Sequence, residues 1–392
     1  MTKILLDLLI MFAAAKLFGE IFERLKLPAV VGEILAGVCL GPYFLHIITP
    51  TEFYHVLAEI GVIILLFYVG LQTGIDEIIK VGKNSISVAV LGVVLPFILG
   101  YAYVLFSGHS TVEGMFIGAA MVATSVGITA RVMADLNVLD KKVSKVILAA
   151  AVADDIIGMI VLAIVTGMEK GTLSYLNIIL VILEAVGFVI FLMIIGHRVI
   201  KRVTPKVDSL KTRNAPFAFA IILCLALSVL AGYIKLAAIV GAFMAGMILS
   251  EFNIRFSLSS KMESLYDFLV PFFFVVMGAN VDLTVFGKWE ILGLALILTF
   301  LAVIGKLVGC SLGAINLGFK QATIIGVGMV PRGEVGMIIA SIGLSLGTVS
   351  RDLYSVVIFM VVMTTILTPP ILRMLLSRWK DSLGPSGKMS AP

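Results

Sequence analysis

The sequence predicts an all-α polytopic membrane protein with about 13 transmembrane helices, arranged as two inverted six-helix repeats with a linker helix and broken crossing helices. Hydrophobic residues make up 60% of the 392 residues and charged residues only 14%, which excludes an ordinary soluble domain. Apolar stretches long enough to span a bilayer recur along the whole chain. The basic residues are scattered among short loops, so the expected partner is the lipid bilayer and not a nucleic acid.

The apolar stretches give the expected helices in chain order. They lie at roughly 3–20, 28–46, 56–76, 84–107, 113–135, 144–168, 174–197, 214–233, 236–251, 262–284, 289–315, 320–346 and 352–375. The first stretch is followed at once by a second, so a cleaved signal peptide is not expected. The loops and the tail after Arg373 are short, so a folded soluble domain is not expected either.

The loop charges predict the orientation of the chain. Alternate loops are rich in Lys and Arg, whereas the intervening loops carry only Lys170, Lys235, Lys288 and Arg351. Basic loops stay on the cytoplasmic side of a membrane. The N-terminus is therefore expected outside the cell and the C-terminus in the cytoplasm.

Two pairs of similar segments indicate an internal repeat. The segment "LPAVVGEILAG" at 27–37 resembles "LAAIVGAFMAG" at 236–246, and "GAAMV" at 118–122 resembles "GVGMV" at 326–330. Repeat one then covers about 3–168 and repeat two about 214–375, with a linker helix at about 174–197. One linker span between the halves gives them opposite orientations, the plan of many secondary transporters. The alternative is chance similarity between helices rich in Gly and Ala.

Equivalent helices of the two repeats are expected to be interrupted at mid-membrane depth. The stretch "VATSVGITARV" at 122–132 places Thr124 and Ser125 beside a glycine, where hydroxyl and freed carbonyl oxygens could bind a cation. The stretch "GMVPRGEVG" at 328–336 contains Pro331, which removes a backbone donor and disfavours helix at the preceding residue. For the two hydroxyls alone, simple packing is the alternative.

Three charged residues fall at these breaks. Arg332 and Glu334 are expected to form a structural pair that braces the crossing half-helices, with Arg131 available as a third member. A bracing role is favoured over direct ion binding, because an unpaired charge is costly in hydrocarbon.

Two adjacent acids lie in the middle of an apolar helix, in "ILAAAVADDIIGMIVLAIV" at 147–165. Each ionised carboxylate there costs roughly 2.5–3.5 kcal/mol, so Asp154 and Asp155 need partners. Lys306, in "LAVIGKLVGCSLGA" at 301–314, is equally deep and needs an acid. Successive residues of a helix point about 100 degrees apart, so one acid can bind Lys306 while the other lines a water-filled cavity.

These groups are suited to exchanging a cation for protons. A bare Na⁺ or Li⁺ needs several oxygen ligands, which both acids, the region of Thr124 and Ser125, and water could supply. Protons can discharge the same carboxylates when the cation leaves. If only the loaded and the discharged forms cross between inward-facing and outward-facing states, the result is obligatory antiport. No cofactor and no enzymatic activity are expected.

The motifs "VADD", "ATSVGITAR", "GKLVG" and "VPRGEVG" together resemble the prokaryotic sodium/proton antiporters of the second cation:proton antiporter family, particularly the NapA type. The resemblance implies sodium/proton exchange in a prokaryotic cell membrane by an elevator-like mechanism. If two protons cross for each Na⁺, net charge moves, so the exchange is expected to be electrogenic. The resemblance also implies a homodimer, with a dimerisation part at about 3–76 and 214–284 and a core part at about 84–168 and 289–375. By position, Asp155 would bind the ion, Asp154 would pair with Lys306, and Thr124 and Ser125 would belong to the crossing.

Several alternatives stay open at this stage. Potassium/proton exchange on the same scaffold is the main one. A cation channel is a remote alternative, because a buried lysine faces the acids. An intramembrane aspartyl protease is also remote, because its two acids must lie on different helices, whereas these two are adjacent on one helix. Lys306 itself could carry a proton or could serve only as a counter-charge.

Overall fold

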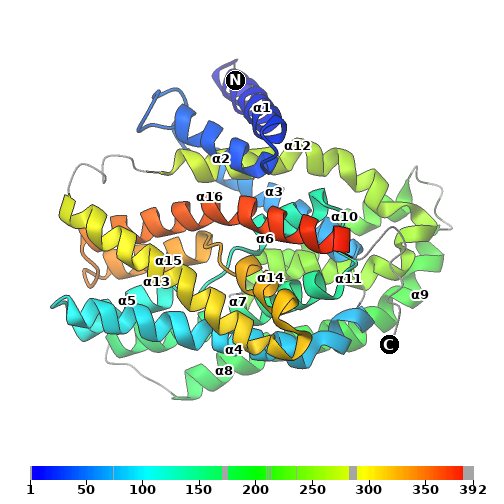
Figure 1. The fold of residues 1–392 in the computed structure, drawn as a ribbon. Coiled ribbons are helices and arrows are strands. Elements are labelled where there is room, and N and C mark those ends of the chain that lie inside the picture. The colour runs from blue at the N-terminus through cyan, green and yellow to red at the C-terminus, as the bar shows by residue number, and fades with distance from the viewer. Residues whose placement is uncertain are drawn as a thin grey trace.

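The computed structural model consists of α-helices, with no strand among the residues that it describes (Figure 1). These are residues 2–382 except 74, 170–174, 209, 211, 213, 235 and 282–288. In chain order the helices are α1 (Thr2–Arg24), α2 (Ala29–Leu40), α3 (Glu52–Leu71), α4 (Ile75–Phe106), α5 (Thr111–Ala120), α6 (Val126–Asp135), α7 (Lys142–Glu169), α8 (Tyr175–Phe191), α9 (His197–Asp208), α10 (Ala215–Tyr233), α11 (Ala238–Phe256), α12 (Leu258–Ala279), α13 (Trp289–Gly313), α14 (Phe319–Gly328), α15 (Glu334–Ser345) and α16 (Arg351–Ser382).

Seven of the described helices are long and apolar enough to cross a membrane, namely α3, α4, α7, α10, α12, α13 and α16. Their outer surfaces carry large apolar side chains, for example Ile98 of α4, Ile222 of α10 and Phe300 of α13, each more than half exposed. Such a surface needs lipid as its solvent. The chain is a multi-pass membrane protein, as its composition predicted.

The helices pack into two bundles. In the first, which we call the scaffold bundle, α2 packs on α1 and α12, and α3 packs on α11 and α12, with α10 beside α11. In the second, the crossing bundle, α4 packs on α5, α7 and α13, while α14, α15 and α16 complete the group. The α6 helix of the crossing bundle lies against α2 and α3 of the scaffold bundle. The interface between the bundles therefore runs along α6.

Glycines bring helices of the scaffold bundle into close contact. A Cβ atom at Gly37 of α2 would clash with the carbonyl oxygen of Val275 in α12. A Cβ atom at Gly246 of α11 would likewise clash with the carbonyl oxygen of Phe67 in α3. Only glycine permits these distances between backbones, as is common where membrane helices cross.

The two helices that the sequence predicted to be interrupted are interrupted. The stretch 113–135 forms α5 and α6, separated at residues 121–125, and the stretch 320–346 forms α14 and α15, separated at 329–333.

Several other helical regions differ from the expected spans. The α4 helix begins at Ile75, before the expected start at 84, and α2 ends at Leu40, before the expected end at 46. The last helix runs to Ser382, beyond the expected end at 375, and the linker region continues through a π-helical turn, Leu192–Gly196, into α9. Both extensions contain several charged residues, which end an apolar stretch without ending a helix.

Candidate ion-binding site

The ends of the broken helices meet and are joined by hydrogen bonds. The Ser125 backbone N–H donates to the carbonyl oxygen of Pro331 at 2.8 Å. The Thr124 hydroxyl donates to the Met329 carbonyl oxygen at 3.2 Å, and the Thr129 hydroxyl donates to the Gly328 carbonyl oxygen at 2.6 Å. Backbone groups freed by the two breaks therefore satisfy one another, which makes irregular backbone tolerable at membrane depth.

Arg332 stabilises this crossing from within. Its side chain is fully buried, and Nη1 donates to the carbonyl oxygens of Val122 and Ala123, each at 3.1 Å, while Nη2 donates to the Ala302 oxygen at 3.1 Å. Val122 and Ala123 directly follow α5, so the positive charge lies at the negative end of that helix dipole. Glu334 is the first residue of α15, and its side chain lies outside the described part of the chain.

Asp154 and Lys306 form a buried ion pair between α7 and α13. Lys306 Nζ donates to both carboxylate oxygens of Asp154, at 2.7 and 2.9 Å. Neither side chain is exposed. Each charge thus has its partner within hydrogen-bonding distance, which offsets part of the cost of removing both from water.

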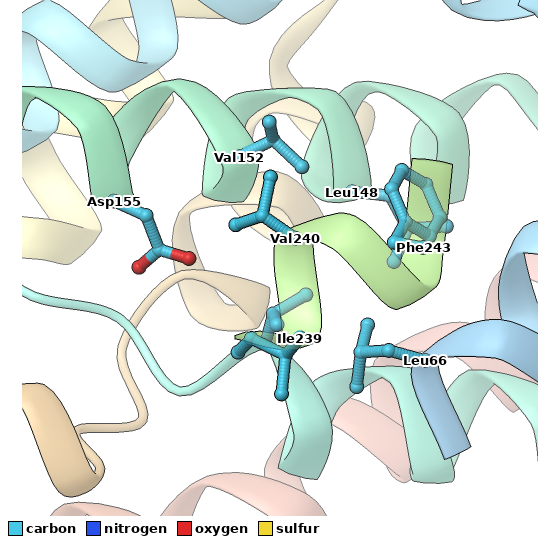
Figure 2. A pocket seen from close by; sticks show the side chains of 8 residues that line it. Leu66, Leu148, Val152, Asp155, Ile239, Val240 and Phe243 are labelled. Carbon is cyan, nitrogen blue, oxygen red and sulfur yellow. The ribbon is translucent and has the colours of Figure 1, made fainter. Parts of the chain in front are cut away.

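Asp155 faces different surroundings from those of its neighbour. It lines a cavity of about 10 Å³ together with Val126, Val152, Ile239 and other apolar residues of four helices. Figure 2 shows the carboxylate of Asp155 beside Val152, Val240 and Ile239. The cavity has room for about one water molecule. The Asp155 side chain therefore borders a space of the size of one water molecule.

A larger cavity, which we call the vestibule, lies between the bundles. Its volume is about 340 Å³, and its wall includes His55, Glu59 and Val62 of α3, Met277 of α12 and Met337, which belongs to α15. Ile239 lines both the vestibule and the cavity of Asp155. A single side chain thus borders both spaces.

The expectation that Arg131 could join Arg332 and Glu334 is not tested for Glu334, whose side chain is not described. The described contacts of Arg131 lie elsewhere. Its Nε lies 3.0 Å from Oδ1 of Asp135, one turn along α6, and its Nη2 lies 3.8 Å from Oε1 of Glu33 in α2. Its guanidinium also lies 4.8 Å from the ring centroid of Tyr266 in α12. The physical reason is its position on the face of α6 that packs against the scaffold bundle.

Comparison with known proteins identifies the family. A family model described as "Sodium/hydrogen exchanger, transmembrane" matches residues 9–378. The chain belongs to the sodium/hydrogen exchanger family. Members of this family are membrane transporters and not enzymes, and the resemblance that the motifs indicated is confirmed.

Relatives of this exchanger cover nearly its whole length. The high-affinity Na⁺/H⁺ antiporter NhaS3 of Synechocystis sp. is 36% identical, over 99% of this chain and 93% of that protein. The Na⁺/H⁺-K⁺ antiporter GerN of Bacillus cereus is also 36% identical, over 92% of this chain and 93% of that protein. The solved structure of the sodium proton antiporter MjNhaP1 from Methanocaldococcus jannaschii matches with a TM-score of 0.65 over 96% of each chain, at 19% identity. The exchanger therefore shares the fold of that structure.

Sequence reasoning missed the partners of both buried arginines in this exchanger. The spacing of Arg131 and Asp135, one helical turn apart, was a usable signal for an ion pair. The contact with Tyr266 had no such signal, because 135 residues separate the two positions. No local sequence signal predicted the contact of Arg332 with Thr365 either, whose hydroxyl donates to the Arg332 carbonyl oxygen at 2.9 Å.

Proposed function

We propose that this exchanger moves Na⁺, or Li⁺, out of the cytoplasm in exchange for protons that enter, with Asp155 as the ion-binding acid. One observation carries the proposal. Asp155 lines a cavity of atomic size, and its neighbour Asp154 is already neutralised by Lys306. The names of the relatives, which are Na⁺/H⁺ antiporters, support the choice of cargo.

The ligands of the cation come from the crossing and from α7. Asp155 supplies the carboxylate that also accepts a proton, and Asp154 supplies a second carboxylate when Lys306 releases it. Thr124 and Ser125 contribute oxygen atoms from the break between α5 and α6, since the Thr124 hydroxyl still has lone pairs after donating to Met329. Oxygen ligands of this kind suit a hard cation.

Alternating access rests on a pseudo-symmetric architecture of about 13 spans in two inverted repeats. The glycine contacts of the scaffold bundle support the repeat. Gly246 follows Gly37 by 209 residues and Val275 follows Phe67 by 208, so the same contact recurs with the halves exchanged. If α5 with α6, α8 with α9 and α14 with α15 are each counted as one span, the described helices agree with an architecture of about 13 spans.

The moving parts are the two bundles. The scaffold bundle corresponds to the dimerisation part at about 3–76 and 214–284, and the crossing bundle to the core part at about 84–168 and 289–375. In an elevator-like cycle the crossing bundle carries Asp155 past the scaffold, which forms a homodimer in the cell membrane with the N-terminus outside and the C-terminus inside. The vestibule between the bundles supports this division.

The test is ion exchange in proteoliposomes, with internal pH recorded as Na⁺, Li⁺ or K⁺ is added on one side. Asp155→Asn keeps the volume and removes the ionisable group, so cation-driven proton movement should fall to that of protein-free liposomes. Asp140→Asn is the matched control, because Asp140 is 65% exposed and pairs only with the adjacent Lys141 among the contacts described. Near-normal exchange by Asp155→Asn would refute the assignment.

The same assay tests the second candidate cargo. The relative from Bacillus cereus is named a Na⁺/H⁺-K⁺ antiporter, which favours K⁺ as the alternative. A response to K⁺ equal to or larger than the response to Na⁺ would replace sodium/proton exchange by potassium/proton exchange at the same Asp155. A response to neither ion would overturn both.

A further inference from the structure

A second buried group of charged and polar side chains lies away from Asp155, at the interface of the two bundles. Arg131 of the crossing bundle contacts Glu33 and Tyr266 of the scaffold bundle, with Nη2 to Oε1 at 3.8 Å and the guanidinium 4.8 Å from the ring centroid. Only 9% of the Arg131 side chain and 3% of the Glu33 side chain are exposed. A buried ion pair is costly unless its geometry is good, and this one is too long for a hydrogen bond.

Three polar atoms of this group have no hydrogen-bond partner among the described residues. They are Oε2 of Glu33, Nη1 of Arg131 and the hydroxyl of Tyr266. Buried polar atoms in a rigid core are nearly always satisfied, and exceptions call for a specific explanation. Here they are explained if the group has a second arrangement, in which these atoms find other partners.

Two helices show where the group lies relative to the cavities. Along α3, residues 55–62 line the vestibule, Leu66 lines the cavity of Asp155, and Tyr68 packs against Tyr266, with ring centroids 4.9 Å apart. Along α12, Tyr266 belongs to the charged group, and residues 273–280 line the vestibule. The charged group therefore lies on the side of Asp155 opposite to the vestibule.

The α6 helix connects the group to the site. Val126, at its first turn, lines the cavity of Asp155, and Arg131 is five residues further on, about 7.5 Å along the axis. Arg131 is held to its own helix by Asp135, through Nε at 3.0 Å. A movement of α6 away from α2 would therefore carry Arg131 and Asp135 together and separate Arg131 from Glu33.

We propose that Glu33 and Arg131 form an ion-pair gate, which closes the access path to Asp155 on the side opposite to the vestibule and opens when the crossing bundle moves. This inference rests on the proposed alternating-access function. It adds to that function two residues, Glu33 and Arg131, which contact neither Asp154 nor Lys306. In the structure the vestibule is present on one side of Asp155, and the pair is in contact on the other side. Opening exposes the Glu33 carboxylate to the path, where it attracts an incoming cation.

The experiment measures access to the site from each face of the membrane, without measuring transport. A reporter, Val152→Cys, lies in the wall of the Asp155 cavity, in a background whose three native cysteines are replaced. A charged thiol reagent is added to right-side-out and to inverted vesicles, and the labelling rate is followed. Glu33→Gln should raise the rate from the gate face about tenfold, because an ion pair made in one state only shifts the two-state equilibrium. The rate from the vestibule face should not rise.

Three further variants make the result specific. The exchange of charges, Glu33→Arg with Arg131→Glu, should restore protection on the gate face. Glu33→Asp covers the case in which Glu33→Gln does not fold, and it should raise labelling in the same direction. Glu251→Gln is the control, because it breaks the exposed pair between Lys201 and Glu251 and should leave both rates unchanged.

Unchanged labelling on the gate face in folded Glu33 variants would overturn the gate, and so would an equal rise on both faces. Neither result touches the proposed function, which the proteoliposome assay decides through Asp155. Conversely, loss of the sodium response in that assay would overturn the proposal that Na⁺ is the transported cation. The labelling result would still report on the gate.

Discussion

At the scale of residues, two neighbouring acids on α7 lie in different surroundings. Asp154 is fully buried and receives two hydrogen bonds from Lys306, whereas Asp155 borders a cavity lined mainly by apolar side chains. The pairing of Asp154 with Lys306 offsets part of the cost of burying both charges. In the proposed mechanism this pair is coupled to cation binding, since a cation that binds Asp154 would compete with Lys306.

Asp154→Asn should lower stability, because Lys306 is then buried without its partner. Breaking a buried pair by removing one member costs about 3–5 kcal/mol. We expect a clearly lower midpoint of thermal unfolding in detergent, and a partial recovery when Lys306→Gln is added. Glu251→Gln, which breaks an exposed pair, should change the free energy of unfolding by less than about 1 kcal/mol. Equal midpoints for wild type and Asp154→Asn would contradict the structural role of the pair.

Lys306→Gln separates the two possible roles of the lysine. If Lys306 releases a proton when the cation takes Asp154, the variant should still exchange ions but without net charge movement. If Lys306 is only a counter-charge, exchange should stay voltage-dependent. The driving force is then about 2.3 kcal/mol for each elementary charge that crosses a potential of 100 mV. We expect the first outcome. Charge movement on a solid-supported membrane, paired with flux at clamped voltage, gives the answer, and an undiminished current per Na⁺ would exclude Lys306 as a carrier.

At the scale of elements, the crossing depends on small residues where the broken helices touch. Gly333 is the last residue before α15, and a Cβ atom there would lie 2.7 Å from Cβ and 2.8 Å from Oγ of Ser125. Ser125 also donates its N–H to Pro331. A larger residue at position 333 must therefore push apart the two segments that meet at the crossing.

Gly333→Ala should destabilise the protein by about 1–3 kcal/mol, as overpacking of a tight contact does. It should also reduce exchange, because the oxygen atoms of the α5/α6 break move away from Asp155. Gly232→Ala in α10 is the control, since no atom lies within 4 Å of a Cβ atom at that position. Thermal unfolding and proteoliposome flux of the two variants make the comparison, and equal behaviour of both would show that the contact at Gly333 is unimportant.

At the scale of the whole molecule, the exchanger consists of two bundles whose interface includes α6. Gly127 of α6 packs against Val62 of α3, with 3.2 Å between a Cβ atom built at Gly127 and Cγ2 of Val62. Within the scaffold bundle, a Cβ atom at Gly19 of α1 would lie 3.5 Å from Cβ of Ala29 in α2. The second distance joins two Cβ atoms and fits a disulfide bond within a bundle. The first ends on Cγ2 of Val62, one bond beyond its Cβ atom, so a cysteine pair at these positions can be cross-linked between the bundles.

A disulfide between Val62→Cys and Gly127→Cys should stop exchange if the bundles move against each other, and a reductant should restore it. The disulfide between Gly19→Cys and Ala29→Cys should leave exchange unchanged, because it joins parts that stay together. Both double variants are made without the three native cysteines, and proteoliposome flux is measured before and after reduction. Full exchange by the oxidised Val62/Gly127 pair would contradict an elevator-like motion.

Sequence patterns alone predict the membrane class, the places where helices break, and the residues that chemistry requires to have partners. Each of these follows from local pattern: apolar length, Pro331 between glycines, and charges inside apolar helices. The partner of each charge depends on the tertiary structure. Helix geometry left open which of the two acids binds Lys306; the family resemblance named Asp154, and the structure shows that pair across 152 residues. The contact of Arg131 with Glu33 was not predicted and is seen in the structure alone. The physical reason is that adjacent helical residues differ only in direction, and the packing of α7 and α6 against distant helices decides what lies in each direction.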